Sequence, residues 1–221
     1  DHWRYRELLP ISPEAVLPHL HVGWTPVYDV PRLAAAIGIR KMFLKDDGRN
    51  PTSSFKDRAS SVGVLKAQEF GFATIACAST GNAASSLAGL SAAVGLKSVI
   101  LVPQRTPEPK VTQLLIFGAT VVRVMGTYEN AFDLCREACK TFGWYDRNGG
   151  TNPFLVEGKK TAGLEIAEQF GATIPDWVVV SVGDGCTIGG IGKGLQEMRR
   201  LGFIDRVPKL LGVQAEGARP L

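Results

Sequence analysis

The stretch Thr74-Ile75-Ala76-Cys77-Ala78-Ser79-Thr80-Gly81-Asn82 is an apolar run that ends in a polar turn with one glycine. A short apolar run bounded by turn residues is typical of a buried strand. After the turn, small residues continue to Gly95, which suits the left-handed position just past a helix end. The stretch therefore predicts a strand over 74–78, a loop over 79–82 and a helix after it.

The same alternation of strand and helix continues along the chain. Further strands are expected at 98–103, 120–125, 177–182 and 210–215. The helices between and around them are expected to end near Phe70, Gly95, Gly118, Phe142, Phe170 and Arg200. Strands that alternate with helices indicate an α/β fold with parallel sheets covered on both faces. The run Trp177–Val182 is apolar apart from one serine, which predicts a fully buried parallel strand.

Length and composition exclude several classes of protein. The chain has 221 residues, of which 45% are hydrophobic and 21% are charged, so disorder, collagen and a disulfide scaffold are excluded. The net charge of +4 is modest and the basic residues are scattered, so neither nucleic acid nor an anionic membrane is indicated as a partner. No apolar run approaches the roughly 18–20 residues that span a bilayer. We expect a soluble protein.

The cysteines and histidines do not form a recognisable site. The four cysteines contain no CxxC pair, and Cys135 and Cys139 have no histidine nearby to complete a metal site. The three histidines lie near the N-terminus, away from the glycine-rich loops, so neither a metal centre nor a histidine-based triad is predicted. This use of cysteine fits a reducing, cytoplasmic compartment.

The first candidate site is Asn50-Pro51-Thr52-Ser53-Ser54-Phe55-Lys56-Asp57-Arg58. Ser53 or Ser54 can cap a helix that runs to Phe70, which places Lys56 in the first turn. The positive end of the helix dipole disfavours a cation there, so the pKa of the Lys56 amine is expected to fall. A lowered pKa suits a lysine that attacks a carbonyl. The alternative is an ordinary exposed lysine beside Asp57.

The second candidate site is the turn Ser79-Thr80-Gly81-Asn82, which joins a strand to a helix. Its hydroxyls and free backbone N–H groups can hold an anion such as a carboxylate or phosphate. The alternative is simple capping of the helix by Thr80 or Asn82.

The third candidate site is Gly183-Asp184-Gly185-Cys186-Thr187-Ile188-Gly189-Gly190, which follows a strand and opens a helix. It is not the dinucleotide fingerprint, because Ile188 stands where a third glycine is needed, and it lacks the Gly-Lys-Ser/Thr of a Walker A loop. Phosphate binding by its backbone amides is the favoured interpretation, with a plain tight turn as the alternative. Asp184 is expected to point away from those amides, since a carboxylate repels a phosphate.

A lysine suited to carbonyl chemistry, an anion-binding turn and a phosphate loop in one α/β chain suggest pyridoxal 5'-phosphate (PLP). That cofactor needs both a lysine and a phosphate site.

The phrase Ser54-Phe55-Lys56-Asp57-Arg58, with Asn50-Pro51-Thr52 before it and Ser79-Thr80-Gly81-Asn82 after it, resembles the threonine synthase family. These are fold type II (tryptophan synthase β-like) PLP enzymes. Three further segments are similar to the N-terminal region of that family: 3–10, 23–27 and 45–48. The resemblance covers essentially the whole chain.

The resemblance implies a role for each candidate residue. Lys56 would hold the cofactor covalently and move protons, with Phe55 beside it at the cofactor. Asn82 would hydrogen-bond the cofactor's 3'-oxygen, and Ser79, Thr80 and Gly81 would bind the substrate carboxylate. The cofactor phosphate would lie against Gly183, Asp184, Gly185, Cys186 and Thr187. The implied enzyme is a lyase of threonine biosynthesis that converts O-phosphohomoserine and water to threonine and phosphate, as a homodimer.

The resemblance also implies a division into two doubly wound units. Residues 56–147 would form a smaller α/β domain, and 148–221 the first part of a larger PLP-binding domain that residues 1–55 join. The segment Arg147–Pro153, rich in Gly and Asn, is the predicted linker. Because the chain starts at Asp1 and stops soon after a strand, we expect a piece of a longer polypeptide that lacks the rest of the larger domain.

The glycine loop departs from the family pattern, which commonly reads Gly-Asn-Ala-Gly-Asn, at Asp184, Cys186 and Thr187. Three alternatives therefore stay open: another fold type II enzyme such as a threonine/serine dehydratase, a non-catalytic module of the same fold and, more distantly, a nucleotide-binding oxidoreductase. A phosphorylated substrate would need a further cationic site, for which Arg58 and Lys110 are the candidates.

Overall fold

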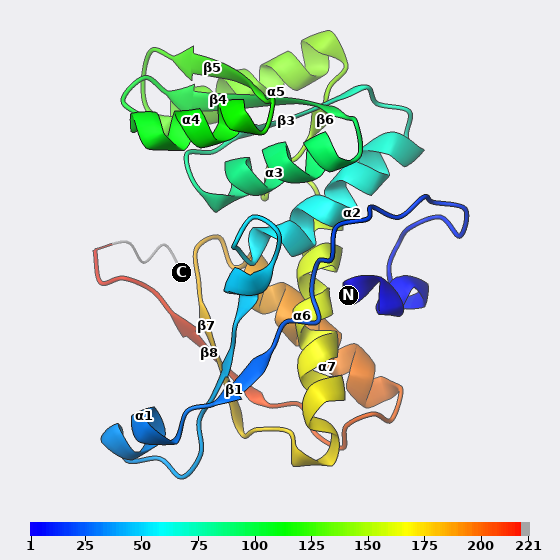
Figure 1. Ribbon diagram of the computed structural model, residues 1–221, viewed down its shortest axis with the longest axis vertical. Helices are drawn as coiled ribbons and strands as arrows, with labels where there is room; N and C mark the ends of the chain where they lie inside the picture. The colour runs from blue at the N-terminus through cyan, green and yellow to red at the C-terminus, as the bar shows by residue number, and fades with distance from the viewer. Residues whose placement is uncertain (218–221) are drawn as a thin grey trace.

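A four-stranded parallel sheet forms one end of the molecule (Figure 1). The computed structural model describes residues 1–217. The strands lie in the order β5-β4-β3-β6, and every neighbouring pair is parallel. Their bounds are β3 (Thr74–Ala78), β4 (Lys97–Pro103), β5 (Thr120–Val124) and β6 (Tyr145–Asp146). The first three strands were predicted within two residues at each end, whereas the two-residue β6 was not predicted.

Helices cover both faces of this sheet. The connecting helices are α3 (Asn82–Ala93), α4 (Glu108–Ile116) and α5 (Tyr128–Phe142). Apolar side chains of α3 and α4 pack on one face, together with those of α2 (Lys56–Glu69), and those of α5 pack on the other. Gly95 has φ of +70° directly after α3, as its position in the sequence predicts. The expected doubly wound α/β arrangement is confirmed.

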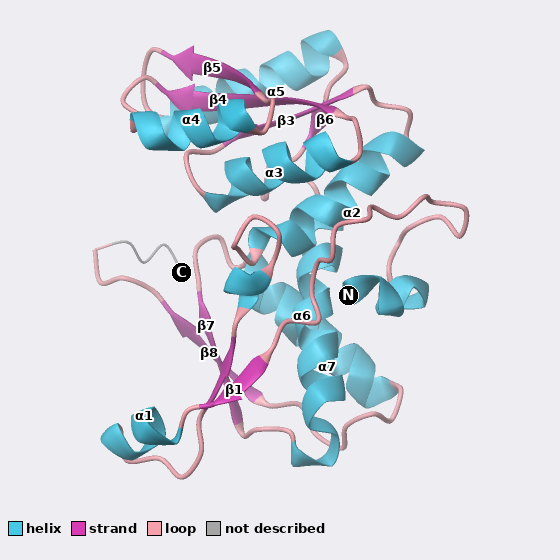
Figure 2. Cartoon of the chain, in the orientation of Figure 1, coloured by secondary structure: helices cyan, strands magenta, loops and turns pink. Residues whose placement is uncertain are grey.

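Three helices connect this sheet to the rest of the molecule (Figures 1 and 2). Helix α6 (Phe154–Phe170) packs on α2 and on α7 (Cys186–Arg200). The backbones approach closely: a Cβ on Gly158 would lie 2.0 Å from the carbonyl oxygen of Arg58, and one on Gly163 would lie 2.2 Å from that of Ile191. Glycine at these two positions lets the three helices meet.

The close contact at Gly163 leads to a stability prediction. Gly163→Ala is expected to lower the free energy of unfolding by about 1–3 kcal/mol, because the new methyl group can enter only if α6 and α7 separate. The matched control is Gly189→Ala on α7, where a Cβ meets no atom within 4 Å. It should leave stability unchanged or raise it by up to about 1 kcal/mol. Urea unfolding followed by circular dichroism measures both, and equal midpoints would contradict the packing described.

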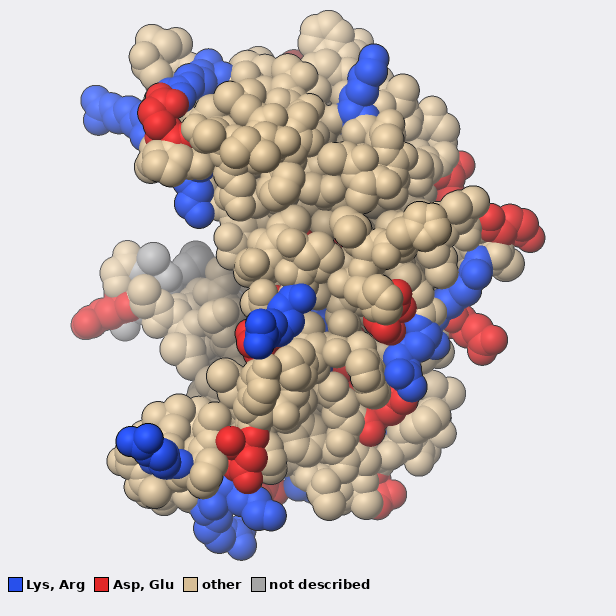
Figure 3. All heavy atoms as spheres, viewed as in Figure 1, with Lys and Arg blue, Asp and Glu red and all other residues tan. Residues whose placement is uncertain are grey.

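The remaining elements lie at the other end of the molecule. Strands β7 (Trp177–Ser181) and β8 (Lys209–Val213) pair in parallel, and β1 (Val27–Asp29) and β2 (Phe43–Lys45) pair antiparallel. The short helices are η1 (His2–Leu8), α1 (Pro31–Ala36), η2 (Asp47–Arg49) and η3 (Gly171–Thr173). On the face drawn in Figure 3, Lys and Arg lie among Asp and Glu and do not gather into one patch. Within residues 1–217, no helix is long and apolar enough to cross a membrane.

The prediction that Trp177–Val182 is buried on both faces is wrong. Val180 is 7% exposed, but Trp177 is 53% and Val179 is 62% exposed. Apolar residues of α6 and α7 pack on the side of β7 that carries Val180. The alternate positions of β7, together with Leu211 and Val213 of β8, are exposed within the part of the chain that the structure describes.

Candidate functional site

Lys56 is the first residue of α2, and the turn before it is tightly held. Ser54 Oγ accepts the Lys56 backbone N–H at 3.2 Å, although the helix boundary lies at Phe55 and not at either predicted serine. The Asp57 carboxylate accepts hydrogen bonds from the backbone and hydroxyl of Thr52. Asp57 therefore fixes the turn and leaves the Lys56 ammonium without a carboxylate from its own helix.

The pKa of Lys56 is lowered, in the direction that its position predicts. Burial of the half-buried side chain is the largest cause, and the positive charge of Arg147 is the next. Asp184 and Cys186 act in the opposite direction, which places the glycine loop close to the Lys56 amine. We expected the helix dipole to be the cause, but burial and a second cation are larger effects.

The turn Ser79–Asn82 lies between β3 and α3 at the carboxyl end of the parallel sheet. Ser79 Oγ accepts the Gly81 N–H at 3.2 Å, and no side chain caps α3, which begins at Asn82. Thr80 and Asn82 are exposed. Capping of the helix, the alternative explanation of this turn, is therefore not what these side chains do here. Their polar groups stay open to a ligand.

The glycine loop follows β7 and leads into α7, which begins at Cys186. Gly185 has φ of +78°, a conformation that side chains other than glycine rarely adopt. Asp184 Oδ1 accepts the Cys186 N–H at 3.0 Å, so the expectation that Asp184 points away from the loop amides is wrong. Burial raises the pKa of Asp184, but the positive charge of Lys159 and the Cys186 amide lower it more, which favours the ionised carboxylate.

The segment Arg147–Gly149 brings these parts together, although the sequence predicts it to be a linker. Arg147 donates to Ser60 Oγ from Nη2 at 3.0 Å, one turn along α2 from Lys56. Asn148 Oδ1 accepts the N–H of Ala78, directly before Ser79, at 3.0 Å.

The last residue of that segment reaches the glycine loop. The Gly149 carbonyl lies 3.7 Å from Cys186 Sγ, and a Cβ on Gly149 would lie 2.7 Å from Asp184 Oδ2. The segment therefore contacts α2, the end of β3 and the glycine loop at once. All three predicted constellations meet around it.

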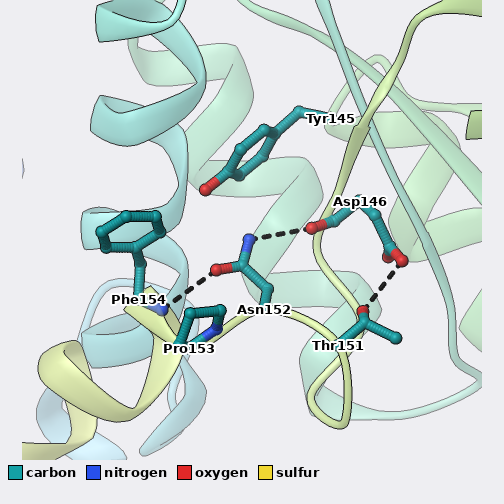
Figure 4. Close-up of a pocket in the computed structure, with 6 residues that line it drawn as sticks. All are labelled: Tyr145, Asp146, Thr151, Asn152, Pro153 and Phe154. Atoms are coloured by element: carbon teal, nitrogen blue, oxygen red, sulfur yellow. Dashed lines mark hydrogen bonds between the residues drawn. The ribbon is translucent and has the colours of Figure 1, made fainter.

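Figure 4 shows how the loop after β6 is held. Asn152 Nδ2 donates to the Asp146 carbonyl at 2.8 Å, and Thr151 Oγ1 donates to the Asp146 carboxylate at 2.8 Å. Asn152 Oδ1 accepts the Phe154 N–H at 3.0 Å, and α6 begins there, four residues before the predicted start. The pocket in this view contains none of the predicted site residues. Its hydrogen bonds brace the segment that carries Arg147.

Lys159, on α6, is a second residue that sequence reasoning missed. Its side chain belongs to a residue that is 3% exposed, and within residues 1–217 it has neither a hydrogen-bond nor a salt-bridge partner. Burial lowers the pKa of Lys159, while the nearby Asp184 and Cys186 raise it. The neighbouring Lys160 is also buried but forms salt bridges with Glu157 and Glu197.

Two predicted residues have different surroundings. Arg58, a candidate for a substrate phosphate, is completely buried and its guanidinium binds Asp47 and Glu165, so it is not available to a ligand. Lys110 is exposed on α4. Phe55 is half-buried beside Lys56, with its ring 5.8 Å from the centre of the Arg58 guanidinium.

The residues present fit a PLP molecule. Lys56, Arg147 and Lys159 are at least half-buried cations around one carboxylate, Asp184. Uncompensated buried charge is unfavourable, so this arrangement favours a ligand with anionic groups. PLP carries a phosphate and an aldehyde that a lysine can attack. Among residues 1–217, no cluster of His, Cys, Asp and Glu could hold a metal ion.

The sequence comparisons agree with this chemistry. A family described as "Pyridoxal-phosphate dependent enzyme" matches residues 19–221. The chain belongs to this family. It is 41% identical to the threonine synthase of Methanocaldococcus jannaschii and 44% identical to that of Methanosarcina acetivorans. Each match covers 99% of this chain and 54% of the relative, so the chain spans about half the length of these proteins.

Solved structures of the family share the fold. A PLP-dependent aspartate racemase matches 89% of this chain, which corresponds to 59% of the racemase, with a TM-score of 0.77 and 25% identity. A bacterial-type comparison is the T.th. threonine deaminase, which matches 87% of this chain and 59% of its own, with a TM-score of 0.75 and 25% identity. The fold type II assignment and the PLP dependence are therefore confirmed, as is a lyase related to threonine synthase.

Proposed function

We propose that the chain forms the cofactor-binding and substrate-binding part of an enzyme that converts O-phosphohomoserine and water to threonine and phosphate. The observation that carries this proposal is its 41–44% identity to two threonine synthases over 99% of its length. The convergence of Lys56, the Ser79 turn and the glycine loop supports it. As part of the proposal, the enzyme is cytoplasmic and homodimeric.

In this proposal each candidate residue acts on the substrate or the cofactor. Lys56 holds the cofactor and, once released from it, moves the substrate protons. Asn82 binds the 3'-oxygen of the cofactor, Phe55 packs beside it, and residues 183–187 bind its phosphate. Ser79, Thr80 and Gly81 hold the substrate carboxylate. When bound, PLP supplies an electron sink that makes the protons at Cα and then at Cβ removable, so that phosphate can leave from Cγ.

Product analysis tests the reaction. The protein reconstituted with PLP is expected to release phosphate and threonine from O-phosphohomoserine, and to form little keto acid from threonine. The 25% identity to a threonine deaminase makes a dehydratase the second candidate. Keto acid formed from threonine without phosphate release would favour that candidate. The absence of both products, with PLP bound, would favour a non-catalytic module.

The glycine loop leads to a prediction about cofactor affinity. Gly185→Val is expected to weaken PLP binding by the apoprotein at least tenfold, because φ of +78° is strained for valine and the branched side chain blocks the loop amides. Asp184→Asn should bind PLP as tightly or more tightly, since its amide oxygen can still accept the Cys186 N–H while the repulsion of phosphate is removed.

Absorbance titrations of both apoprotein variants with PLP measure these effects. If Asp184→Asn weakens binding tenfold and Gly185→Val has no effect, the cofactor phosphate is bound elsewhere.

A further inference from the structure

Two buried cations beside the glycine loop have no anionic partner within residues 1–217. Arg147 is 4% exposed and Lys159 is 3% exposed. Arg147 donates from Nε and Nη2 to the neutral hydroxyl of Ser60, and no partner of Nη1 lies among the described residues. The other strongly buried cations of the chain, Arg58 and Lys160, each bind two carboxylates.

The fold brings these two cations to the same place. Arg147 packs along α2, where its Cγ would lie 3.9 Å from a Cβ on Gly63, and its hydrogen bond to Ser60 places its guanidinium one turn from Lys56. Lys159 lies on α6 where that helix crosses the start of α7: its Cβ would lie 2.9 Å from a Cβ on Gly190 (Figure 1).

Charge is not balanced at this junction. Asp184 is the one carboxylate that influences Lys56, Arg147 and Lys159 together. It lies against Gly149 and caps the start of α7, and Cys186 follows it. Asp57 also faces Arg147, but Thr52 occupies its carboxylate. When Lys56 is bound to a cofactor, Arg147 and Lys159 still exceed Asp184 by one positive charge.

We propose that Arg147 and Lys159 form a binding site for a phosphate monoester, at the junction of α2, α6 and the glycine loop. The ester is either the 5'-phosphate of the cofactor or the phosphate of the amino-acid substrate, and the assignment rests on the proposed function. A dianion neutralises two cations that are otherwise buried without a partner, and hydrogen bonds between charged groups are the strongest of their kind.

The experiment compares ligands with and without phosphate on matched variants. Lys159→Gln and Arg147→Met each remove one charge at similar side-chain length. Lys193→Gln is the control, because Lys193 is a half-exposed lysine of α7 that pairs with Glu157 and Glu197. Apoprotein is titrated with PLP and with pyridoxal. Holoenzyme is titrated with O-phosphohomoserine and with homoserine, followed by the change in cofactor absorbance.

A weakening of about tenfold to a hundredfold is expected for the phosphorylated member of one pair, and little change for its unphosphorylated partner. Loss in the PLP pair assigns the site to the cofactor, and loss in the O-phosphohomoserine pair assigns it to the substrate. The proposal is overturned if both variants match Lys193→Gln in both pairs, or if the ligands of a pair weaken equally. The PLP pair is informative even if the protein releases no phosphate from O-phosphohomoserine, so the two proposals can fail separately.

The stability of the apoprotein provides a second measurement that does not need a ligand-binding site to be intact. Removing an unpaired buried charge should leave the melting temperature of Lys159→Gln equal to or above that of the unchanged protein. PLP should then raise that temperature less than it does in the unchanged protein if the site binds the cofactor. A lower melting temperature for Lys159→Gln would show that Lys159 has a structural anionic partner, which would overturn the proposal.

Discussion

Replacing Lys56 by alanine is expected to abolish covalent attachment of PLP and to lower turnover by about 10²–10⁴-fold or more. The amine is the nucleophile for the cofactor aldehyde, and in the proposed reaction it also moves the proton at Cα. Among the described residues, Arg147 and Lys159 are the cations nearest to this centre that could respond. A guanidinium is protonated at neutral pH and cannot act as the base.

The measurements are the visible absorbance of the bound cofactor, its sensitivity to borohydride, and phosphate release from O-phosphohomoserine. Lys140→Ala is the matched control, because this lysine is 70% exposed on α5 and its contact with Glu137 is at the surface. It should bind PLP and react as the unchanged protein does. Full activity of Lys56→Ala, with the fold intact by circular dichroism, would show that the reacting lysine is elsewhere.

The fold could be predicted because its signals are local. The strands over 74–78, 98–103 and 120–125 are continuous apolar runs, and glycines at 95, 118 and 143 have positive φ just past the helices that precede them. The two-residue strand β6 is too short for any periodicity, so the segment after it was predicted to be a linker. A polar group that directly follows the aromatic pair Trp144-Tyr145 was the available signal, because it repeats the pattern of an apolar run followed by ligand-binding residues.

The fate of charged residues could not be predicted in the same way. Arg58 stands beside the reacting lysine in the sequence, but on α2 its side chain enters the interior, where Asp47 and Glu165 meet it. Lys159 and Lys160 are adjacent, yet only Lys160 has carboxylate partners among residues 1–217. The partners of a buried charge come from distant parts of the chain, so tertiary packing decides whether a cation has a structural role or is open to a ligand.

Breaking the buried network around Arg58 is expected to have the largest effect on stability. Arg58 Nη1 lies 2.6 Å from Glu165 Oε1, with both side chains completely buried, and its Nε lies 2.7 Å from Asp47 Oδ2. Lys45 reaches Glu165 at 2.8 Å. These contacts tie α2 to α6 and to the strands of the N-terminal segment. Arg58→Met should cost about 3–5 kcal/mol of the free energy of unfolding, since it leaves the carboxylates desolvated and partly unpaired.

Urea unfolding of a matched set of variants measures this effect. Glu165→Gln should be destabilising for the same reason, and the double variant Arg58→Met/Glu165→Met should lose less than the sum of the single variants. Glu108→Gln is the control, because Glu108 is 74% exposed in its pair with Arg123, and it should change stability by less than about 1 kcal/mol. An Arg58→Met variant as stable as this control would contradict a structural role for the network.

The same network gives the stability a direction with pH. Burial would raise the pKa of Glu165, but Arg58 and Lys45 hold it at about 2, below the ordinary value of 4.5. Burial and then Arg58 lower the pKa of His2 to about 3, from 6.5. Both groups bind more protons in the unfolded chain, so their contributions are fully present above about pH 6.5 and are lost as pH falls toward 2. Unfolding free energies measured between pH 7 and pH 3 should therefore fall with acidity. The fall should be smaller in Glu165→Gln, which has no carboxylate to protonate, and an equal fall in both proteins would show that Glu165 does not titrate with folding.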